Sequence, residues 1–119
     1  MKLVLLLALL LSFTLYAADK QYNRGEMLYF SKGCNGCHGP SAEGGSGVPE
    51  LAQKRQINLS HKLKNFRLGN VSSQSQEMMA QFALKLSDQE ISDLTYFLSH
   101  HKDANHEGVS SELLGGFGS

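Results

Sequence analysis

The residues best suited to chemistry stand together in one short segment. Two cysteines and a histidine occur in the run Cys34-Asn35-Gly36-Cys37-His38. This C-x-x-C-H spacing is typical of the attachment of a c-type haem, in which two thiols add to the vinyl groups of the macrocycle. Gly36 has no Cβ and allows a tight turn between the two sulfurs, and the histidine that follows can supply an imidazole to the iron. The pattern therefore predicts one covalently bound haem c, held by Cys34 and Cys37, with His38 as the proximal iron ligand.

Three other uses of the cysteine pair fit the sequence less well. A structural zinc site needs four ligands, and the chain has no third cysteine. The remaining histidines stand at spacings that match no common zinc pattern: His61, His100, His101 and His106. A thioredoxin-like pair needs alternating strands and helices, for which the surrounding sequence shows no pattern. A disulfide across two residues would close a very small loop and remove little chain entropy.

The second axial ligand is expected downstream of the motif. A methionine thioether opposite a histidine is a soft donor that raises the reduction potential. Met27 lies just ahead of the motif on an expected helix, where it is assigned to the core. Met78 and Met79 lie before the last expected helix, in a stretch interpreted as a loop that folds over the opposite face of the haem. Core filling is the alternative for a methionine pair, and His61 is the alternative ligand.

The start of the chain has the pattern of a secretory signal peptide, predicted for residues 1–18. Lys2 supplies a positive charge, residues 3–15 are almost continuously apolar, and Ala17 and Ala18 are small residues suited to cleavage. The apolar run is shorter than the ~20 residues that a membrane-spanning helix needs. We therefore expect cleavage after Ala17 or Ala18, and no stable membrane insertion afterwards. Haem c is attached outside the cytoplasmic membrane, so the signal and the motif both indicate an exported, periplasmic protein.

Length and charge restrict what remains to one small domain. About 100 residues follow the signal, which is the size of one domain. A core of this size is marginal by itself, and a covalently bound apolar plate such as haem would enlarge it. The whole chain has 11 basic and 11 acidic side chains and no net charge. Because it has no basic stripe, the chain is not expected to bind nucleic acid.

The rest of the chain reads as helices joined by glycine-rich loops, which predicts an all-α domain. A first helix is expected to start at an Asn23 cap and to end near residue 32. Its buried candidates are Met27, Phe30 and Tyr29. The glycines, serines and prolines of residues 39–49 then predict a loop.

Two further helices are expected. A middle helix starts at a Ser60 cap and ends at Gly69. The last helix has the clearest signals, because Ser87 and Glu90 match a capping box and an apolar face at helical spacing follows. That face comprises Ile91, Leu94 and Leu98, with Phe97 beside it. The domain is expected to cover residues 19–102, and a flexible tail is expected at residues 103–119.

These features resemble the small bacterial class I c-type cytochromes with a single haem, of the cytochrome c4 or c553 kind. The most specific part is the run from Cys34 to Gly39, and the second is the run from Met79 to Asp88. In the family, a ligand methionine precedes a leucine-serine-aspartate helix start by this interval. The resemblance therefore implies Met79, and not Met78, as the second axial ligand. It also implies a few helices wrapped around one haem c.

Other residues can be compared with the family pattern. The resemblance implies that the Pro49 carbonyl accepts a hydrogen bond from the proximal imidazole, and it assigns Phe97 to the contact between the first and last helices. Gly25 stands one residue further from Cys34 than the helix-crossing glycine of the family, so that contact is not assigned to it. Gln53 stands where many relatives have a glycine. The candidate partners of the haem propionates, with solvated surface as the alternative, are Arg55, Arg67 and Asn70.

The resemblance implies an electron carrier and not an enzyme, because a six-coordinate iron has no open position for a substrate. The first expectation is a periplasmic shuttle that moves single electrons between a membrane electron donor and a terminal oxidase or reductase. The alternative is the haem c electron-accepting subunit of a complex similar to flavocytochrome c sulfide dehydrogenase, with a flavoprotein as its partner. A permanent partner needs an exposed apolar patch, and only the tail offers an unassigned apolar segment, at Leu113, Leu114 and Phe117. We therefore expect the free shuttle.

Overall fold

The computed structural model describes residues 1–102 of the 119-residue chain. In this part the chain forms five α-helices, and one isolated bridge between Gly45 and Val48 is the only β-type pairing. The helices are α1 (Lys2–Ser31), α2 (Asn35–His38), α3 (Gln56–Arg67), α4 (Gln74–Ala83) and α5 (Asp88–His100). The expected all-α architecture is confirmed for the described part. The tail predicted for residues 103–119 lies outside the described residues.

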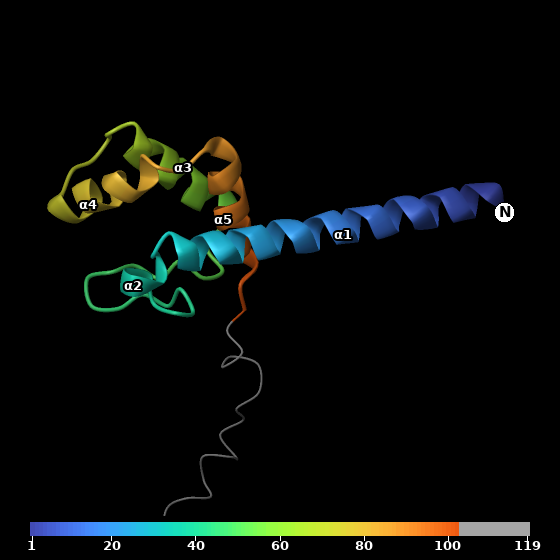
Figure 1. The fold of residues 1–119 in the computed structure, drawn as a ribbon, viewed down its shortest axis with the longest axis horizontal. Helices are drawn as coiled ribbons and strands as arrows, with labels where there is room; N and C mark the ends of the chain where they lie inside the picture. The colour runs from blue at the N-terminus through green and yellow to red at the C-terminus, as the bar shows by residue number, and fades with distance from the viewer. Residues whose placement is uncertain (103–119) are drawn as a thin grey trace, which may run out of the picture.

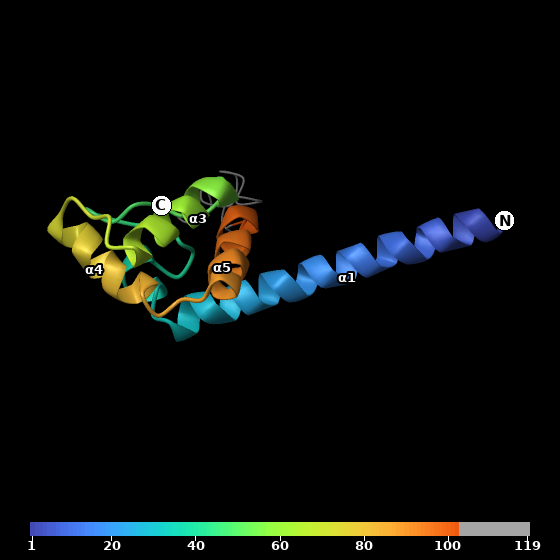
Figure 2. The ribbon, with the colours of Figure 1, turned by 90° about the horizontal axis from the view of Figure 1, so that it is seen from above.

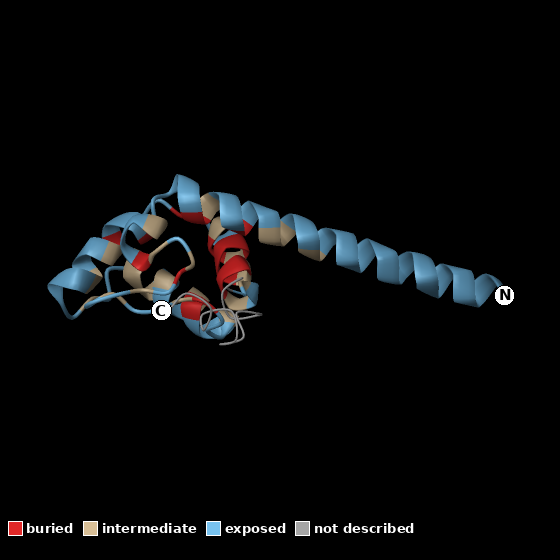
Figure 3. Ribbon diagram, turned by 90° about the horizontal axis from the view of Figure 1, so that it is seen from below, coloured by how far each residue is buried: buried red, intermediate tan, exposed pale blue. Residues whose placement is uncertain are grey.

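Helix α1 is longer than the sequence predicts. It runs without interruption from Lys2, so Asn23 lies inside the helix and is not its cap. Leucine and alanine favour helix, and no proline or glycine stands between them and Gly25 to end it. The first 17 residues are all exposed and project away from the other helices (Figures 1 and 3). Among the described helices, α1 alone is long and apolar enough to cross a membrane, a test that signal sequences also meet.

The core forms where the second half of α1 crosses α5 (Figures 1 and 2). Gly25 lies at this crossing: a Cβ on it would stand 2.0 Å from the carbonyl oxygen of Asp93 and 2.6 Å from the Cβ of Phe97. The helices approach this closely only because Gly25 has no side chain. Gly25 is therefore a helix-crossing glycine in spite of its shifted spacing from Cys34, and the expected contact of Phe97 with α1 is confirmed.

An aromatic pair and a buried carboxylate complete the crossing. Phe97 packs against Tyr29 with ring centroids 5.7 Å apart. The guanidinium of Arg24 donates hydrogen bonds of 2.9 Å and 3.3 Å to the carboxylate of Asp93, whose side chain is only 4% exposed. Gln89 Nε2 donates a third hydrogen bond of 2.9 Å to the same carboxylate. Because a buried charge is tolerated only when it is paired, this group favours one register between α1 and α5.

The buried face of α1 differs from the expected one. Tyr29 is fully buried as predicted, whereas Met27 and Phe30 are 70% and 45% exposed and are not core residues of the protein alone. Gly25 and Tyr29 are four residues apart and therefore lie on the same side of the helix. That side faces α5, so Met27 and Phe30 point elsewhere.

Helix α3 starts one turn earlier than predicted. It begins at Gln56, so Ser60 lies inside the helix and does not cap it. The start is stabilised by contacts that are distant in the sequence, because Gln56 Nε2 donates to the carbonyl oxygen of Ser92 in α5 at 3.3 Å. The end agrees with the prediction, since Gly69 follows the helix with a φ of +81°.

The stretch expected to be a methionine loop is helix α4. Ser73 caps it by accepting a hydrogen bond from the backbone N–H of Gln76. Ala80 and Ala83 are its buried residues, and α4 packs against α3. Met79, Phe82 and Ala83 stand at i, i+3 and i+4, so helical spacing is present in the sequence and the expected loop was wrong.

Helix α5 agrees with its prediction. The capping box is present, with Ser87 Oγ accepting from the Glu90 N–H at 3.1 Å and the Glu90 carboxylate accepting from the Ser87 N–H at 2.8 Å. The predicted apolar face is buried and forms the most continuous buried surface in Figure 3. Its buried members include Ile91, Leu94, Phe97 and Leu98. Local signals were sufficient for this helix.

Replacing Gly25 tests the crossing. Gly25→Ala is expected to lower the free energy of unfolding of the haem-loaded protein by about 2 kcal/mol, because the new methyl group overlaps the Asp93 carbonyl and forces α1 and α5 apart. The measurement is the denaturant midpoint. Asn23→Ala is the control, since Asn23 is exposed on the same helix and alanine is the better helix former. Equal stability of the two variants would contradict the proposed close packing.

Candidate functional site

The C-x-x-C-H motif forms a single helical turn directly after α1. Gly33, with a φ of +77°, reverses the chain at the end of α1. Cys34 precedes α2, and its carbonyl oxygen accepts hydrogen bonds from the N–H groups of Cys37 and His38 at 3.4 Å and 3.0 Å. Both cysteines are free thiols. Two thiols and an imidazole therefore stand within five consecutive positions at one turn of helix, as the sequence predicts.

The two thiols have different surroundings. Cys34 is half-buried and packs against the core, whereas Cys37 is exposed. Burial raises the pKa of the Cys34 thiol. The turn thus has one side anchored in the protein and one side open to a bound group.

The imidazole of His38 is held in one orientation. Its side chain is buried, and Nδ1 lies 2.9 Å from the carbonyl oxygen of Pro49. A carbonyl can only accept a hydrogen bond, so Nδ1 carries a proton, and in the neutral ring the lone pair is therefore on Nε2. The hydrogen bond expected from the resemblance is confirmed. A bond of this kind fixes the ring and raises the basicity of the nitrogen that faces a metal.

The loop after α2 places the Pro49 carbonyl. Backbone hydrogen bonds close it, from the Gly44 N–H to the His38 carbonyl at 2.8 Å and from the Leu51 N–H to the Ala42 carbonyl at 2.9 Å. Gly44 has a φ of +71°, and a Cβ on it would stand 2.5 Å from the Val48 carbonyl oxygen and 2.7 Å from the Pro49 carbonyl carbon. Glycine at this position lets the loop fold tightly under the carbonyl that orients His38.

Tyr29 connects this loop to the core. Its ring is fully buried at the crossing of α1 and α5, and its hydroxyl donates a hydrogen bond to the carbonyl oxygen of Gly39. Burial is the main cause that raises the pKa of the Tyr29 hydroxyl, so it remains a donor at neutral pH. The residue directly after the C-x-x-C-H motif is therefore tied to the same core that joins the helices.

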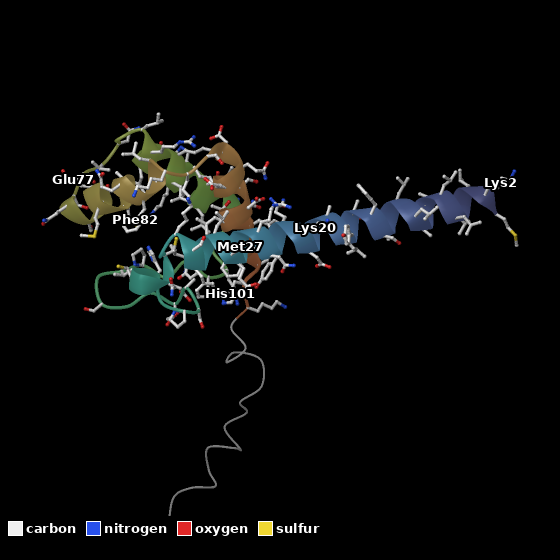
Figure 4. All side chains as sticks on the ribbon, in the orientation of Figure 1. Lys2, Lys20, Met27, Glu77, Phe82 and His101 are labelled. Carbon is white, nitrogen blue, oxygen red and sulfur yellow. The ribbon has the colours of Figure 1, made fainter. Side chains whose placement is uncertain are left out.

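Met79 lies on α4, which is opposite α2 in Figure 1. Met79 is half-buried and lies on the same side of α4 as Ala80 and Ala83. Its neighbour Met78 is 59% exposed. Phe82 is 44% exposed and lies on the side of α4 that is turned toward α2 (Figure 4). The two methionines therefore occupy different environments.

The other candidate residues have less specific positions. His61 is exposed on α3, where its side chain is hydrogen-bonded to Asn65 at 3.3 Å, and this position does not favour it as an iron ligand. Arg55 and Asn70 are exposed. Arg67 instead binds the segment between α4 and α5 through Leu86 and Asp88.

The sequence reasoning missed the residues that make long-range polar contacts. The clearest example is Asp93, which stands one turn before Phe97 on α5 and therefore on a buried side of that helix. An acidic residue at that spacing from a core aromatic is a signal for a buried carboxylate. Its partner Arg24 is 69 positions away, and no local pattern identifies it.

The donor groups and their surroundings fit a c-type haem. Two free thiols occur in one turn, the adjacent imidazole has its Nε2 lone pair available, and apolar side chains such as Met27 and Phe82 are left partly uncovered by the protein. The thiols match the vinyl groups of a haem, the imidazole matches its iron, and the apolar side chains match its apolar macrocycle.

Comparison with known proteins identifies the family. The family model for cytochrome c matches residues 22–102. The chain belongs to the cytochrome c family. The fold of this cytochrome is similar to the crystal structure of reduced recombinant cytochrome c4 from Pseudomonas stutzeri, with a TM-score of 0.63 and 26% sequence identity. The similarity covers 71% of this chain and 50% of that one, so the chain spans about half the length of that protein. No curated protein sequence matches the chain significantly.

The family and fold expected from the resemblance are thus confirmed: the chain is a small class I c-type cytochrome with an all-α fold. Membership of the cytochrome c family implies covalently bound haem c, whose chemistry is one-electron transfer.

A pair of glycine variants tests how His38 is oriented. Gly44→Ala is expected to accelerate solvent exchange of the His38 Nδ1 proton about tenfold, because the methyl group displaces the Pro49 carbonyl and weakens one hydrogen bond. The exchange is measured by NMR on the reduced, haem-loaded protein. Gly47→Ala is the matched control, since Gly47 has a φ of +75° but no neighbour within 4 Å of an added Cβ. Equal acceleration in both variants would indicate general loop strain, and not contact with Pro49.

Proposed function

We propose that this cytochrome is a periplasmic carrier of single electrons. One haem c is attached through thioether bonds to Cys34 and Cys37, and its iron is ligated by His38 and Met79. The electrons pass from a membrane electron donor to a terminal oxidase or reductase. When bound, haem c supplies the one-electron redox chemistry, and the protein supplies attachment, iron ligation and docking.

The observation that carries the proposal is the locked imidazole of His38. The bond from Nδ1 to Pro49 leaves Nε2 as the only ring nitrogen with a lone pair. Ligation needs an imidazole in a fixed orientation with Nε2 toward the metal, and this hydrogen bond supports that orientation. His38 also directly follows the second of the two thiols that would hold the macrocycle.

The environment of Met79 supports its role as the second ligand. A thioether that binds iron has to point inward from its element, and Met79 is half-buried where Met78 is mostly exposed. Met79 lies on a helix and not on the expected loop, so the position of its sulfur depends on how α4 packs as a unit. With His38 and Met79 both as ligands, the iron would have no open position for a substrate, which favours a carrier over an enzyme, a gas sensor or a peroxidase.

The N-terminal half of α1 supports export. Residues 1–17 are exposed, whereas the contacts of α1 with α5 come from residues further along the helix. Those residues include Gln21, Tyr22, Arg24, Gly25 and Tyr29. Cleavage after Ala17 or Ala18 would therefore remove the apolar segment and keep every one of these contacts. We propose that the segment is a signal peptide and that the mature domain starts near residue 19.

Replacing each methionine tests the ligand assignment. Met79→Ala is expected to abolish the weak far-red absorption band of iron–methionine ligation, to lower the reduction potential, and to allow carbon monoxide to bind the reduced protein. These effects follow from loss of a soft axial ligand. Absorption spectra and a redox titration measure them.

Met78→Ala is the control and is expected to keep the far-red band and the potential of the parent protein, because its side chain is exposed. If Met78→Ala loses the band and Met79→Ala keeps it, the assignment is reversed. Retention of the band in both variants would remove methionine from the proposal and make His61 the next residue to test.

The native protein tests location and partners together. Protein purified from periplasmic extracts is expected to have the mass of the chain without residues 1–17 or 1–18 plus one haem, and to carry no flavin. Intact mass spectrometry measures the mass, and an absorption spectrum shows whether flavin is present. Stoichiometric co-purification with a flavoprotein would contradict the free shuttle and favour a subunit similar to that of flavocytochrome c sulfide dehydrogenase. Uncleaved protein in the membrane fraction would contradict signal cleavage.

A further inference from the structure

Arg67 connects the end of α3 to the corner between α4 and α5. It is the last residue of α3. Its Nη1 donates to the carbonyl oxygen of Leu86 at 3.0 Å, and its Nη2 donates to the carboxylate of Asp88. The planar guanidinium can engage two acceptors at once in fixed directions. A single side chain therefore ties the end of α3 to the segment after α4, at Leu86, and to the start of α5, at Asp88.

This corner is rigidly joined to α4. Hydrogen bonds continue past the end of the helix, from the Leu84 N–H to the Ala80 carbonyl at 2.9 Å and from the Leu86 N–H to the Ala83 carbonyl at 3.1 Å. Leu86 is also buried in the core. The backbone thus has no free joint between the middle of α4, where Met79 lies, and the carbonyl that Arg67 binds. A displacement at Leu86 would move α4 as a unit.

The other side of the corner is also held. The capping box of Ser87 and Glu90 fixes the start of α5, and α5 is anchored to α1 through Asp93. Removal of Arg67 would therefore loosen the corner after α4 from the end of α3, while the packing of α4 on α3 and the attachment of α5 to α1 remain. The expected consequence is a local change at α4, and not loss of the fold.

We propose that Arg67 is a positioning residue for the second axial ligand. By holding the Leu86 carbonyl, it fixes the corner of α4 relative to α3 and keeps the Met79 sulfur in place against competing ligands. This inference rests on the proposed ligation by Met79. It gives Arg67 a role different from the propionate contact considered from the sequence, because both ends of its guanidinium are engaged by protein groups.

The two hydrogen bonds of Arg67 contribute unequally. The Asp88 side chain is 77% exposed, and exposed ion pairs contribute little to stability. The hydrogen bond lowers the pKa of the Asp88 carboxyl, so the pair is ionised at neutral pH. The bond to Leu86 is partly buried and reaches the backbone itself. We therefore assign the positioning effect to the bond with the Leu86 carbonyl.

Competition by imidazole measures how firmly Met79 is held. Imidazole added to the oxidised, haem-loaded protein displaces a methionine ligand, and its apparent affinity rises as the methionine is held less firmly. Arg67→Gln is expected to raise this affinity about tenfold, the change that corresponds to loss of one partly buried hydrogen bond to a charged donor. Arg67→Lys is expected to raise it by less, since an ammonium cannot span both acceptors in the same way.

Two control variants separate the positioning effect of Arg67 from the effect of its charge. Lys64→Gln removes an exposed cation one turn earlier on α3, and its effect on the imidazole affinity is expected to stay within about twofold. Asp88→Asn removes the ion pair and keeps the bond to Leu86, with the same expectation. A tenfold effect of either control would overturn the assignment to the Leu86 carbonyl.

A double-mutant cycle decides whether Arg67 acts through Met79. In the Met79→Ala background, Arg67→Gln is expected to leave the imidazole affinity unchanged, because no methionine remains to be held. A tenfold increase in that background as well would overturn the positioning role. Failure of the proposed function would give a different result. Met79→Ala alone would then keep the far-red band and the imidazole affinity of the parent protein. That result would overturn both the ligand assignment and the role of Arg67.

Discussion

The close crossing of α1 and α5 is the constraint on which the rest of the structure depends. The backbones of the two helices meet at Gly25, where an added Cβ would stand 2.0 Å from the Asp93 carbonyl oxygen. The paired carboxylate of Asp93 favours one register, and the buried ring of Tyr29 extends from this contact to the carbonyl of Gly39. Because the C-x-x-C-H turn starts directly after α1, its position follows from this crossing.

The two proposed iron ligands are positioned through backbone carbonyls. His38 is oriented by the carbonyl of Pro49, which a tightly closed loop presents. Met79 belongs to a helix whose C-terminal corner is held at the carbonyl of Leu86 by Arg67. In each case the polar group acts on a segment that is closed by its own hydrogen bonds. A small polar contact can therefore determine where a ligand atom lies, although its own contribution to stability is modest.

The helices differ in how far neighbouring residues in the sequence specify them. Helix α5 agrees with its prediction because a capping box and an apolar face of four large side chains are both written in consecutive residues. Helix α4 was expected to be a loop, although a Ser73 cap and the helical spacing of Met79, Phe82 and Ala83 are both present in its sequence. Gln53 has a φ of +60°. Its N–H donates to the Leu98 carbonyl at 2.8 Å, and this backbone conformation explains why a glycine is suited to the position.

The sequence by itself determined the chemistry: two thiols and an imidazole in one turn, the family, the helical class and the start of the last helix. These features depend on residues within a few positions of one another, so their spacing is sufficient evidence. Only the tertiary structure decided that Gly25 is the crossing point, that Met27 and Phe30 are exposed, and that Arg24 and Arg67 bind groups on distant segments. Such contacts depend on which faces of separate helices meet, and no pattern within a single helix specifies its partner.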